Sequence, residues 1–249
     1  MTIPIEIRET AGVRTLHFGS EWIQGAMRIA RPWNLELDYT REMMSSLLLR
    51  EAPRRVLLIG LGAASLMKFL YRNYPLAHLT VVEIEPDVVA AARQFFKLPE
   101  DPRRIHMVIG DGAEYLLGSS KQFDLILVDG FDENARSGTL ESLSFYKACR
   151  AHLNDNGITA VNLLTSRNRR FDASIKHIAE AFEDRVLVFP SCESGNAIAF
   201  AASGDQIEIS FDELKESALI LKEATGLNLL PTLARIAKAG ICLNNRLVL

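Results

Sequence analysis

The sequence predicts an α/β fold, a mostly parallel, doubly wound sheet with an antiparallel hairpin at one edge, preceded by a small antiparallel β element. Three observations lead to this prediction. The apolar segment 56–59 runs into a glycine turn and a helix, as in a central parallel strand covered on both faces. From residue 55 onward, strand and helix patterns alternate, which indicates stacked right-handed βαβ units. Residues 1 to about 37 instead form short, nearly alternating segments separated by Gly12 and Gly19.

The composition restricts the classes of partner. The chain has 249 residues, of which 48% are hydrophobic and 24% charged, enough for one large domain with small additions. Its net charge of -3 leaves no electrostatic footprint for nucleic acid. The three cysteines are widely spaced, and the five histidines show no metal-ligand spacing. No apolar run reaches membrane-spanning length and no signal-peptide pattern opens the chain. We expect a cytoplasmic protein without a metal, nucleic acid or membrane partner.

The N-terminal segments 3–9, 13–18 and 22–29 predict a small antiparallel meander. Such a small sheet is marginal alone, so it should pack on the main domain or on another subunit. Residues 31–34 form a linker, and apolar residues at helical spacing within 37–48 predict a helix. The predicted organisation is an N-terminal β element, 1–37, and a main domain, 38–249.

The main domain should contain five strands that alternate with helices, then an edge hairpin, then two amphipathic helices with a frayed tail. The predicted strands are 55–60, 79–84, 105–110, 124–129 and 157–164; the helices lie near 63–74, 86–96, 112–118, 141–153 and 172–183; the hairpin is formed by 185–190 and 196–202; and the terminal segment is 211–249.

The glycine turn after the first of these strands has the features of a nucleotide cradle. Gly60 and Gly62 lack a Cβ, so the backbone can approach a ligand closely, and the following helix presents free N–H groups there. Ser65 replaces the third glycine of a dinucleotide fingerprint, so the turn alone fits a plain strand-to-helix connection equally well. Glu83, about 20 residues later at the next strand end, stands where an acid accepts hydrogen bonds from ribose hydroxyls. Together they predict a nucleoside-type ligand.

Three successive strands each end in an acid, at the sheet edge where ligands of open parallel sheets bind. Glu83 is either the ribose ligand or a solvated strand-end acid. Asp111 can accept from an exocyclic amine such as that of adenine, and Gly112 lets the ring approach. The same Asp111 can also cap the helix that begins at Ala113, and both roles can hold at once.

Asp129 follows a buried strand and should lie at the centre of the crevice, close to Asp132. Carboxylates there would attract a cation and accept a proton from an amine nucleophile. The alternative is that Asp129 and Asp132 only stabilise a hydrogen-bonded loop.

A set of stretches has a joint spacing that is far more specific than any single motif. They are Val56–Gly62, Val81–Pro86, Asp101–Arg103, Gly110–Leu116, Phe123–Asp129, and Phe145-Tyr146 followed by Leu153–Gly157. In these stretches the chain resembles the catalytic domain of the spermidine synthases, the polyamine aminopropyltransferases. The N-terminal part is similar too, because Gln24 stands where the family has a cofactor-contacting Gln and Leu37–Met43 resembles the segment with its diamine-contacting Tyr.

The resemblance implies a Rossmann-like, class I S-adenosylmethionine-dependent methyltransferase fold and a transferase activity. The expected reaction moves an aminopropyl group from decarboxylated S-adenosylmethionine to a small-molecule amine such as putrescine. By this resemblance Asp129 is the general base, and Tyr39 and Asp132 hold the diamine. The family also implies a homodimer formed through the N-terminal β element. The residues expected to hold the nucleoside donor are Gln24, Gly60, Gly62, Glu83, Asp111 and Gly112.

The chain differs from the family pattern at three places. Ala63 replaces an Asp that faces the donor's charged amine, Thr40-Arg41 replaces a Gln or His, and the loop 129–133 lacks a proline. Two alternatives therefore stay open: a methyltransferase that uses intact S-adenosylmethionine, and a non-catalytic binder of a nucleoside or polyamine. A nicotinamide-dependent reductase fits less well, because Ser65 breaks the fingerprint.

Overall fold

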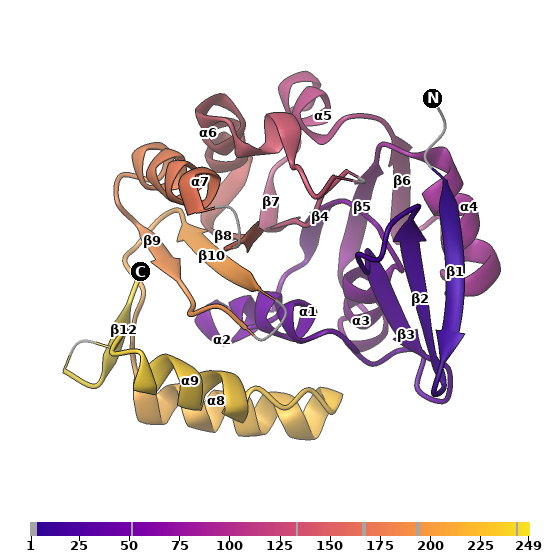
Figure 1. Ribbon diagram of the computed structural model, residues 1–249. Coiled ribbons are helices and arrows are strands. Elements are labelled where there is room, and N and C mark those ends of the chain that lie inside the picture. Colours follow the sequence, from indigo (N-terminus) through magenta and orange to yellow (C-terminus); the bar gives the residue numbers. More distant parts are fainter. Residues whose placement is uncertain (1–3, 51, 133, 166–167, 193–194, 243) are drawn as a thin grey trace.

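The main sheet is mostly parallel, as predicted (Figure 1). The computed structural model describes residues 4–50, 52–132, 134–165, 168–192, 195–242 and 244–249. Within them this sheet has seven strands in the order β6-β5-β4-β7-β8-β10-β9. The first five are parallel, and β10 runs antiparallel to both β8 and β9. The strands are β4 (Arg55–Ile59), β5 (His78–Glu83), β6 (Ile105–Ile109), β7 (Phe123–Val128), β8 (Leu153–Leu164), β9 (Val186–Val188) and β10 (Asn196–Ala202).

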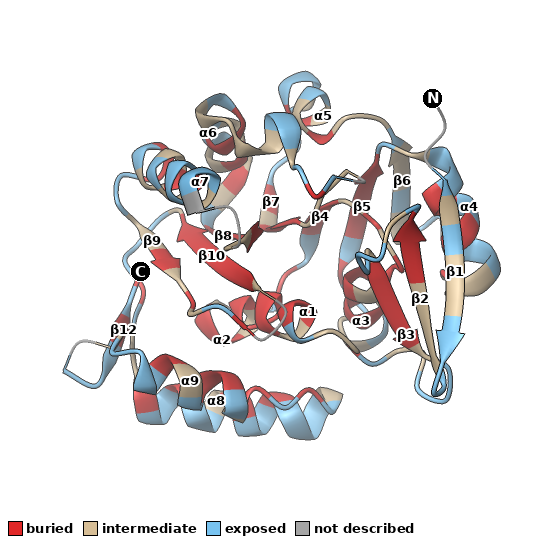
Figure 2. Ribbon diagram, in the orientation of Figure 1, coloured by how far each residue is buried: buried red, intermediate tan, exposed pale blue. Residues whose placement is uncertain are grey.

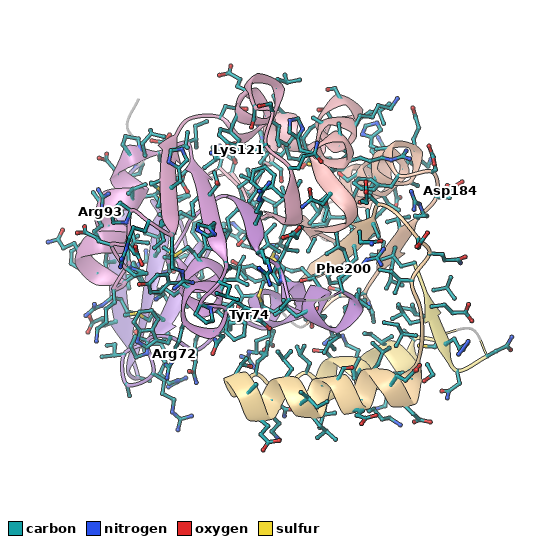
Figure 3. All side chains as sticks on the ribbon, turned by 180° about the vertical axis from the view of Figure 1, so that it is seen from behind. Arg72, Tyr74, Arg93, Lys121, Asp184 and Phe200 are labelled. Carbon is teal, nitrogen blue, oxygen red and sulfur yellow. The ribbon has the colours of Figure 1, made fainter. Side chains whose placement is uncertain are left out.

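Helices cover both faces of the sheet (Figure 1). The helices between its strands are α3 (Ser65–Asn73), α4 (Pro86–Phe95), α5 (Gly112–Gly118), α6 (Leu143–Ala151) and α7 (Asn168–Ala181), with a 3-10 turn at Gly138–Glu141. Side chains of β4 alternate between two cores: Val56 and Leu58 pack with α3 and α4, whereas Leu57 and Ile59 pack with α5, α6 and α7. This two-sided burial explains why the segment is apolar throughout. Figure 3 shows the same arrangement from behind, with the buried Phe200 amid the packed side chains.

The N-terminal segment forms the predicted meander of β1 (Ile5–Thr10), β2 (Val13–Phe18) and β3 (Gly25–Arg28). The last strand is shorter than predicted, since Trp22 and Ile23 precede it as exposed residues. The sheet packs against the main domain, as Leu16 and Met27 join the core of α3 and α4. Its backbone lies so close to the glycine turn that a Cβ on Gly25 would be 2.7 Å from the Ala63 Cβ. The N-terminal sheet is therefore placed directly beside the predicted ligand turn.

The single helix predicted within 37–48 is wrong. The segment forms two short helices, α1 (Asp38–Met43) and α2 (Ser46–Leu49). The break has a local cause: the amides of Met44 and Ser45 donate to carbonyls three residues back, which tightens the turn there. The tightened turn keeps Met43, Met44, Leu48 and Leu49 buried, so the apolar spacing was informative although the continuous helix was not.

The C-terminal segment contains the two predicted helices, α8 (Phe211–Thr225) and α9 (Leu230–Lys238), but the predicted frayed tail is wrong. Strand β12 (Arg246–Val248) pairs antiparallel with β11 (Glu208–Ser210), and Leu247 and Leu249 are buried. Figure 2 shows that α8 and α9 turn their buried sides toward the main domain and their exposed sides away from it. The pairing joins segments more than 30 residues apart, on either side of the helix pair. Among the described residues, no helix is long and apolar enough to cross a membrane.

An ion pair joins α9 to α1: the guanidinium of Arg235 donates to the buried carboxylate of Glu42. Burial raises the pKa of the Glu42 carboxyl, and Arg235 acts against that rise. We expect Arg235→Met to lower the free energy of unfolding by roughly 2–3 kcal/mol at pH 8. This loss is smaller than the one that follows when a fully buried ion pair is broken, because Arg235 is partly exposed.

The deficit of Arg235→Met should shrink toward pH 5. Without its partner, Glu42 has a still higher pKa in the folded state than in the unfolded state, so protonation favours folding of the variant. Urea unfolding at both pH values measures this effect. Lys238→Met, which removes an exposed charge from the same end of α9, is the matched control. Equal stabilities of the two variants would show that the Glu42 ion pair adds nothing.

Candidate functional site

A cavity of about 730 Å³ opens at the carboxyl ends of the parallel strands. Its wall is acidic: of the described residues that line it, six are Asp or Glu, and Arg136 is the only Lys or Arg. Such a wall favours a cationic ligand. All the site residues expected from the sequence line this cavity, namely Gln24, Tyr39, Gly60, Gly62, Glu83, Asp111, Gly112, Asp129 and Asp132.

The glycine turn requires its glycines. Gly60 has a φ of +93°, and a Cβ there would lie 2.1 Å from the carbonyl oxygen of Asp129. Gly62 has a φ of +50°, and its Cβ would lie 2.9 Å from the carbonyl oxygen of Gln24. The turn thus brings the backbones of β4, of the loop after β7 and of the segment before β3 together. Ala63 is buried beside it, against Gly25.

Glu83 is a buried strand-end acid with 7% of its surface exposed, so the alternative of a solvated acid is wrong. One carboxylate oxygen accepts from the Leu61 amide at 2.8 Å and the other from the Glu85 amide at 3.0 Å. Burial raises the pKa of the Glu83 carboxyl, and these backbone hydrogen bonds oppose the rise. A carboxylate has about four acceptor positions, so Glu83 can hold the glycine turn and still accept from a ligand hydroxyl.

Asp111 caps α5, as one of the two readings of the sequence predicted. Its Oδ1 accepts from the amides of Ala113 at 2.7 Å and Glu114 at 3.0 Å. Among the described residues, its Oδ2 has one long contact, of 3.5 Å, with the Thr139 hydroxyl, which leaves that atom acceptor capacity for a ligand. Gly112 is required for packing as well, since a Cβ there would lie 2.4 Å from Cγ2 of Ile59.

Asp129 accepts two side-chain hydrogen bonds, one on each carboxylate oxygen. The Tyr39 hydroxyl donates to Oδ2 at 3.1 Å, and the Asn162 amide donates to Oδ1 at 2.8 Å. Burial raises the pKa of the Asp129 carboxyl, while the two donors lower it. Burial and the charge of Asp129 also raise the pKa of Tyr39, so the phenol stays protonated and donates. Within the described part of the chain, the side-chain donors to Asp129 thus come from α1 and β8 and not from its own loop.

Asp132 has a different environment from Asp129. Its Oδ1 accepts from the amides of Asn134 and Arg136, each at 2.8 Å, so Asp132 does stabilise its own loop, as the alternative interpretation of the sequence had it. Asp132 still lines the cavity. Glu133, part of the same predicted loop, lies outside the described residues.

The cavity residues that the sequence reasoning missed include two asparagines, Asn162 on β8 and Asn196 at the start of β10. Asn162 had a detectable signal, since it is a polar residue within the apolar segment 158–164. Asn196 had none, because it faces the cavity only through the pairing of β10 with β8. Within the described part of the chain, no group of three His, Cys, Asp or Glu side chains is arranged to bind a metal.

Comparisons with known proteins agree with this geometry. The family model of the spermine/spermidine synthase domain matches residues 36–210. A polyamine aminopropyltransferase from Neisseria meningitidis serogroup A is 35% identical over 225 residues, which cover 90% of this chain and 85% of the relative.

Solved structures share the fold. A spermidine synthase in complex with the transition state analogue AdoDATO matches 94% of this chain and 85% of its own with a TM-score of 0.67 at 22% identity. Human methyltransferase-like protein 13 in complex with SAH matches 76% of this chain and 93% of its own with a TM-score of 0.69 at 22% identity. The sheet with its antiparallel β10 is thus of the class I methyltransferase type predicted from the sequence. Since the family model and the relatives cover most of its length, the chain belongs to the spermine/spermidine synthase family.

Proposed function

We propose that the protein transfers an aminopropyl group from decarboxylated S-adenosylmethionine to a primary amine of a polyamine such as putrescine. The observation that carries this proposal is Asp129, a half-buried carboxylate held from both sides by neutral donors at the wall of an acidic cavity. Family membership supports the same reaction.

The chemistry requires a base. A primary amine has a pKa near about 10 and is protonated at neutral pH, so it must lose a proton before it can attack. In the proposed step the amine nitrogen bonds to the carbon next to the sulfonium, the carbon–sulfur bond breaks, and sulfur keeps the electron pair as methylthioadenosine leaves. Asp129 takes the amine proton, and burial makes its carboxylate a stronger base than a solvated one.

The remaining residues bind and align the two substrates. We assign Glu83 to the donor ribose, Oδ2 of Asp111 to its adenine amine, and Gln24 and the glycine turn to the rest of the donor. Tyr39 and Asp132 lie on the acceptor side. Alignment of the donor carbon and the amine would supply much of the remaining acceleration.

The differences from the family pattern bear on the donor more than on the acceptor. Thr40 donates to the Leu37 carbonyl and Arg41 to the Glu36 carbonyl, and neither lines the cavity. Ala63 and Arg136 favour a second candidate, methyl transfer from intact S-adenosylmethionine. Ala63 has no negative charge, so it would not repel the carboxylate of intact S-adenosylmethionine. The Arg136 guanidinium at the cavity wall could attract that carboxylate.

Titration calorimetry with decarboxylated S-adenosylmethionine, intact S-adenosylmethionine and methylthioadenosine tests the proposal, followed by turnover with putrescine. We expect tighter binding of the decarboxylated donor and release of methylthioadenosine. Preference for the intact donor would favour methyl transfer. Binding without turnover on any amine tested would favour a non-catalytic binder, and no binding of the three would contradict a nucleoside site.

We further propose that the protein is a cytoplasmic homodimer, with residues 1–37 as the dimerising β element and 38–249 as the catalytic domain. The resemblance to dimeric aminopropyltransferases supports the dimer, and the wide spacing of the three cysteines, Cys149, Cys192 and Cys242, suits a reducing compartment. Light scattering of the full chain and of a variant with charges introduced on β1 tests the assembly.

A further inference from the structure

Two buried amide side chains form a chain of hydrogen bonds that ends on Asp129. Asn162 and Asn196 are 4% and 7% exposed. The Nδ2 of Asn196 donates to Oδ1 of Asn162 at 2.8 Å, and the Nδ2 of Asn162 donates to Oδ1 of Asp129 at 2.8 Å. None of the expected roles from the sequence involves either amide.

The direction of this chain follows from chemistry. An ionised carboxylate only accepts, so Asn162 must turn its NH₂ group toward Asp129. Its carbonyl oxygen then faces Asn196, which must present its own NH₂ group. The strand register allows this contact: Asn162 is opposite Ile198, and Asn196, two residues away on β10, lies diagonally on the same face. Without Asn196, nothing in this chain of hydrogen bonds would keep the Asn162 carbonyl from turning toward the carboxylate.

We infer that Asn196 and Asn162 act as a positioning relay that fixes the amide orientation facing Asp129 and thereby keeps its carboxylate ionised and aimed into the cavity. The two amides carry no titratable proton, so the relay donates at every pH at which the protein is folded. Tyr39 donates to the other oxygen of Asp129, and both donors oppose the effect of burial. The kinetic part of this inference rests on the proposed function, whereas the effect on the ionisation of Asp129 does not.

Other ionisable groups share the cavity with Asp129, and a variant that tests Asp129 must leave these groups unchanged. They are Tyr39 from α1, Glu21 from the segment before β3, Glu83 and Glu85 at the end of β5, Asp111 before α5, and Asp132 and Arg136 from the loop after β7; Cys192 acts on Tyr39. Replacing an asparagine by leucine changes none of these groups and nearly preserves the side-chain shape.

The test is a titration of the Asp129 carboxyl by ¹³C NMR on protein labelled at aspartate Cγ, with the resonance identified by its loss in Asp129→Asn. We expect Asn162→Leu to raise the apparent pKa of Asp129 by about one unit and Asn196→Leu by about half as much. The double variant should equal Asn162→Leu alone, because Asn196 acts only through Asn162. Asn154→Leu is the matched control: it removes an Asn–Asp hydrogen bond, to Asp124, at the opposite end of the same strand, and should leave Asp129 unchanged.

In the turnover assay, a shift of one unit lowers kcat about tenfold at a pH one unit below the midpoint of the acid limb, with little change at high pH. An unchanged pKa of Asp129 in both leucine variants would overturn the relay, even if the protein transfers aminopropyl groups. Additive shifts in the double variant would overturn it too, because they would mean independent effects. If Asn162→Leu does not fold, the pKa of Asp129 in Asn196→Leu alone tests the relay, since Asn196 can change that pKa only through Asn162. Shifts without turnover in the natural protein would support the relay and contradict the proposed function.

Discussion

Asp129→Asn is expected to lower turnover by about 10²–10⁴-fold, the range that a general base contributes, while donor affinity stays within a few-fold. An amide cannot take the proton of the attacking amine, but it has the shape of the carboxylate. Its oxygen can still accept from Asn162, and its NH₂ group can donate to the Tyr39 hydroxyl. The residues that we propose to bind the donor belong to other segments and should be unaffected. This separation of catalysis from binding distinguishes an enzyme from a non-catalytic binder.

Calorimetry with the donor and a turnover assay on the same preparation measure both quantities. The melting temperature of Asp129→Asn should not fall, because burial raises the pKa of this carboxyl and its ionised form therefore disfavours folding at neutral pH. Asp124→Asn, at the opposite end of the same strand and outside the cavity, controls for loss of a negative charge from β7. Turnover of Asp129→Asn within tenfold of the natural protein would mean that another group is the base.

The cavity could be predicted from the sequence because its position follows from a local pattern. An apolar run in the sequence predicts a buried parallel strand. The residues that follow the carboxyl ends of parallel strands all lie at one edge of the sheet. Glu83, Asp111 and Asp129 were therefore located together without any knowledge of long-range contacts. Their hydrogen-bond partners were less accessible, because Leu61 and Tyr39 reach Glu83 and Asp129 from elements distant in the sequence.

The features that were missed depend on contacts between distant segments. Pairing of β11 with β12 places Leu247 in the core, and the short apolar ending 247–249 is too brief a pattern to predict a strand or its partner. Asn196 depends on a distant segment too, as only the register of β10 against β8 places it beside Asn162. The break between α1 and α2 is the exception, because its cause is the locally tightened turn at Met44 and Ser45, which the apolar periodicity does not reveal.

Gly60→Ala is expected to lower the free energy of unfolding by about 3–5 kcal/mol and to abolish activity in whatever fraction still folds. Two costs add: an alanine at a φ of +93° is strained, and its Cβ would lie 2.1 Å from the Asp129 carbonyl oxygen. Backbone cannot yield as the end of a flexible side chain can, so either the turn or the segment that carries Asp129 has to move.

Gly110→Ala provides the matched control for this substitution. Gly110 follows β6 at the edge of the same cavity, its φ lies outside the left-handed region, and a Cβ there meets nothing within 4 Å. We expect it to change stability by less than about 1 kcal/mol, since surface substitutions without such clashes usually have small effects. Urea unfolding followed by circular dichroism compares the two variants. Equal losses would show that the close approach of Gly60 to the Asp129 carbonyl does not contribute to stability. The expected difference would mean that this one tight contact fixes the glycine turn to the segment that carries Asp129, the proposed base.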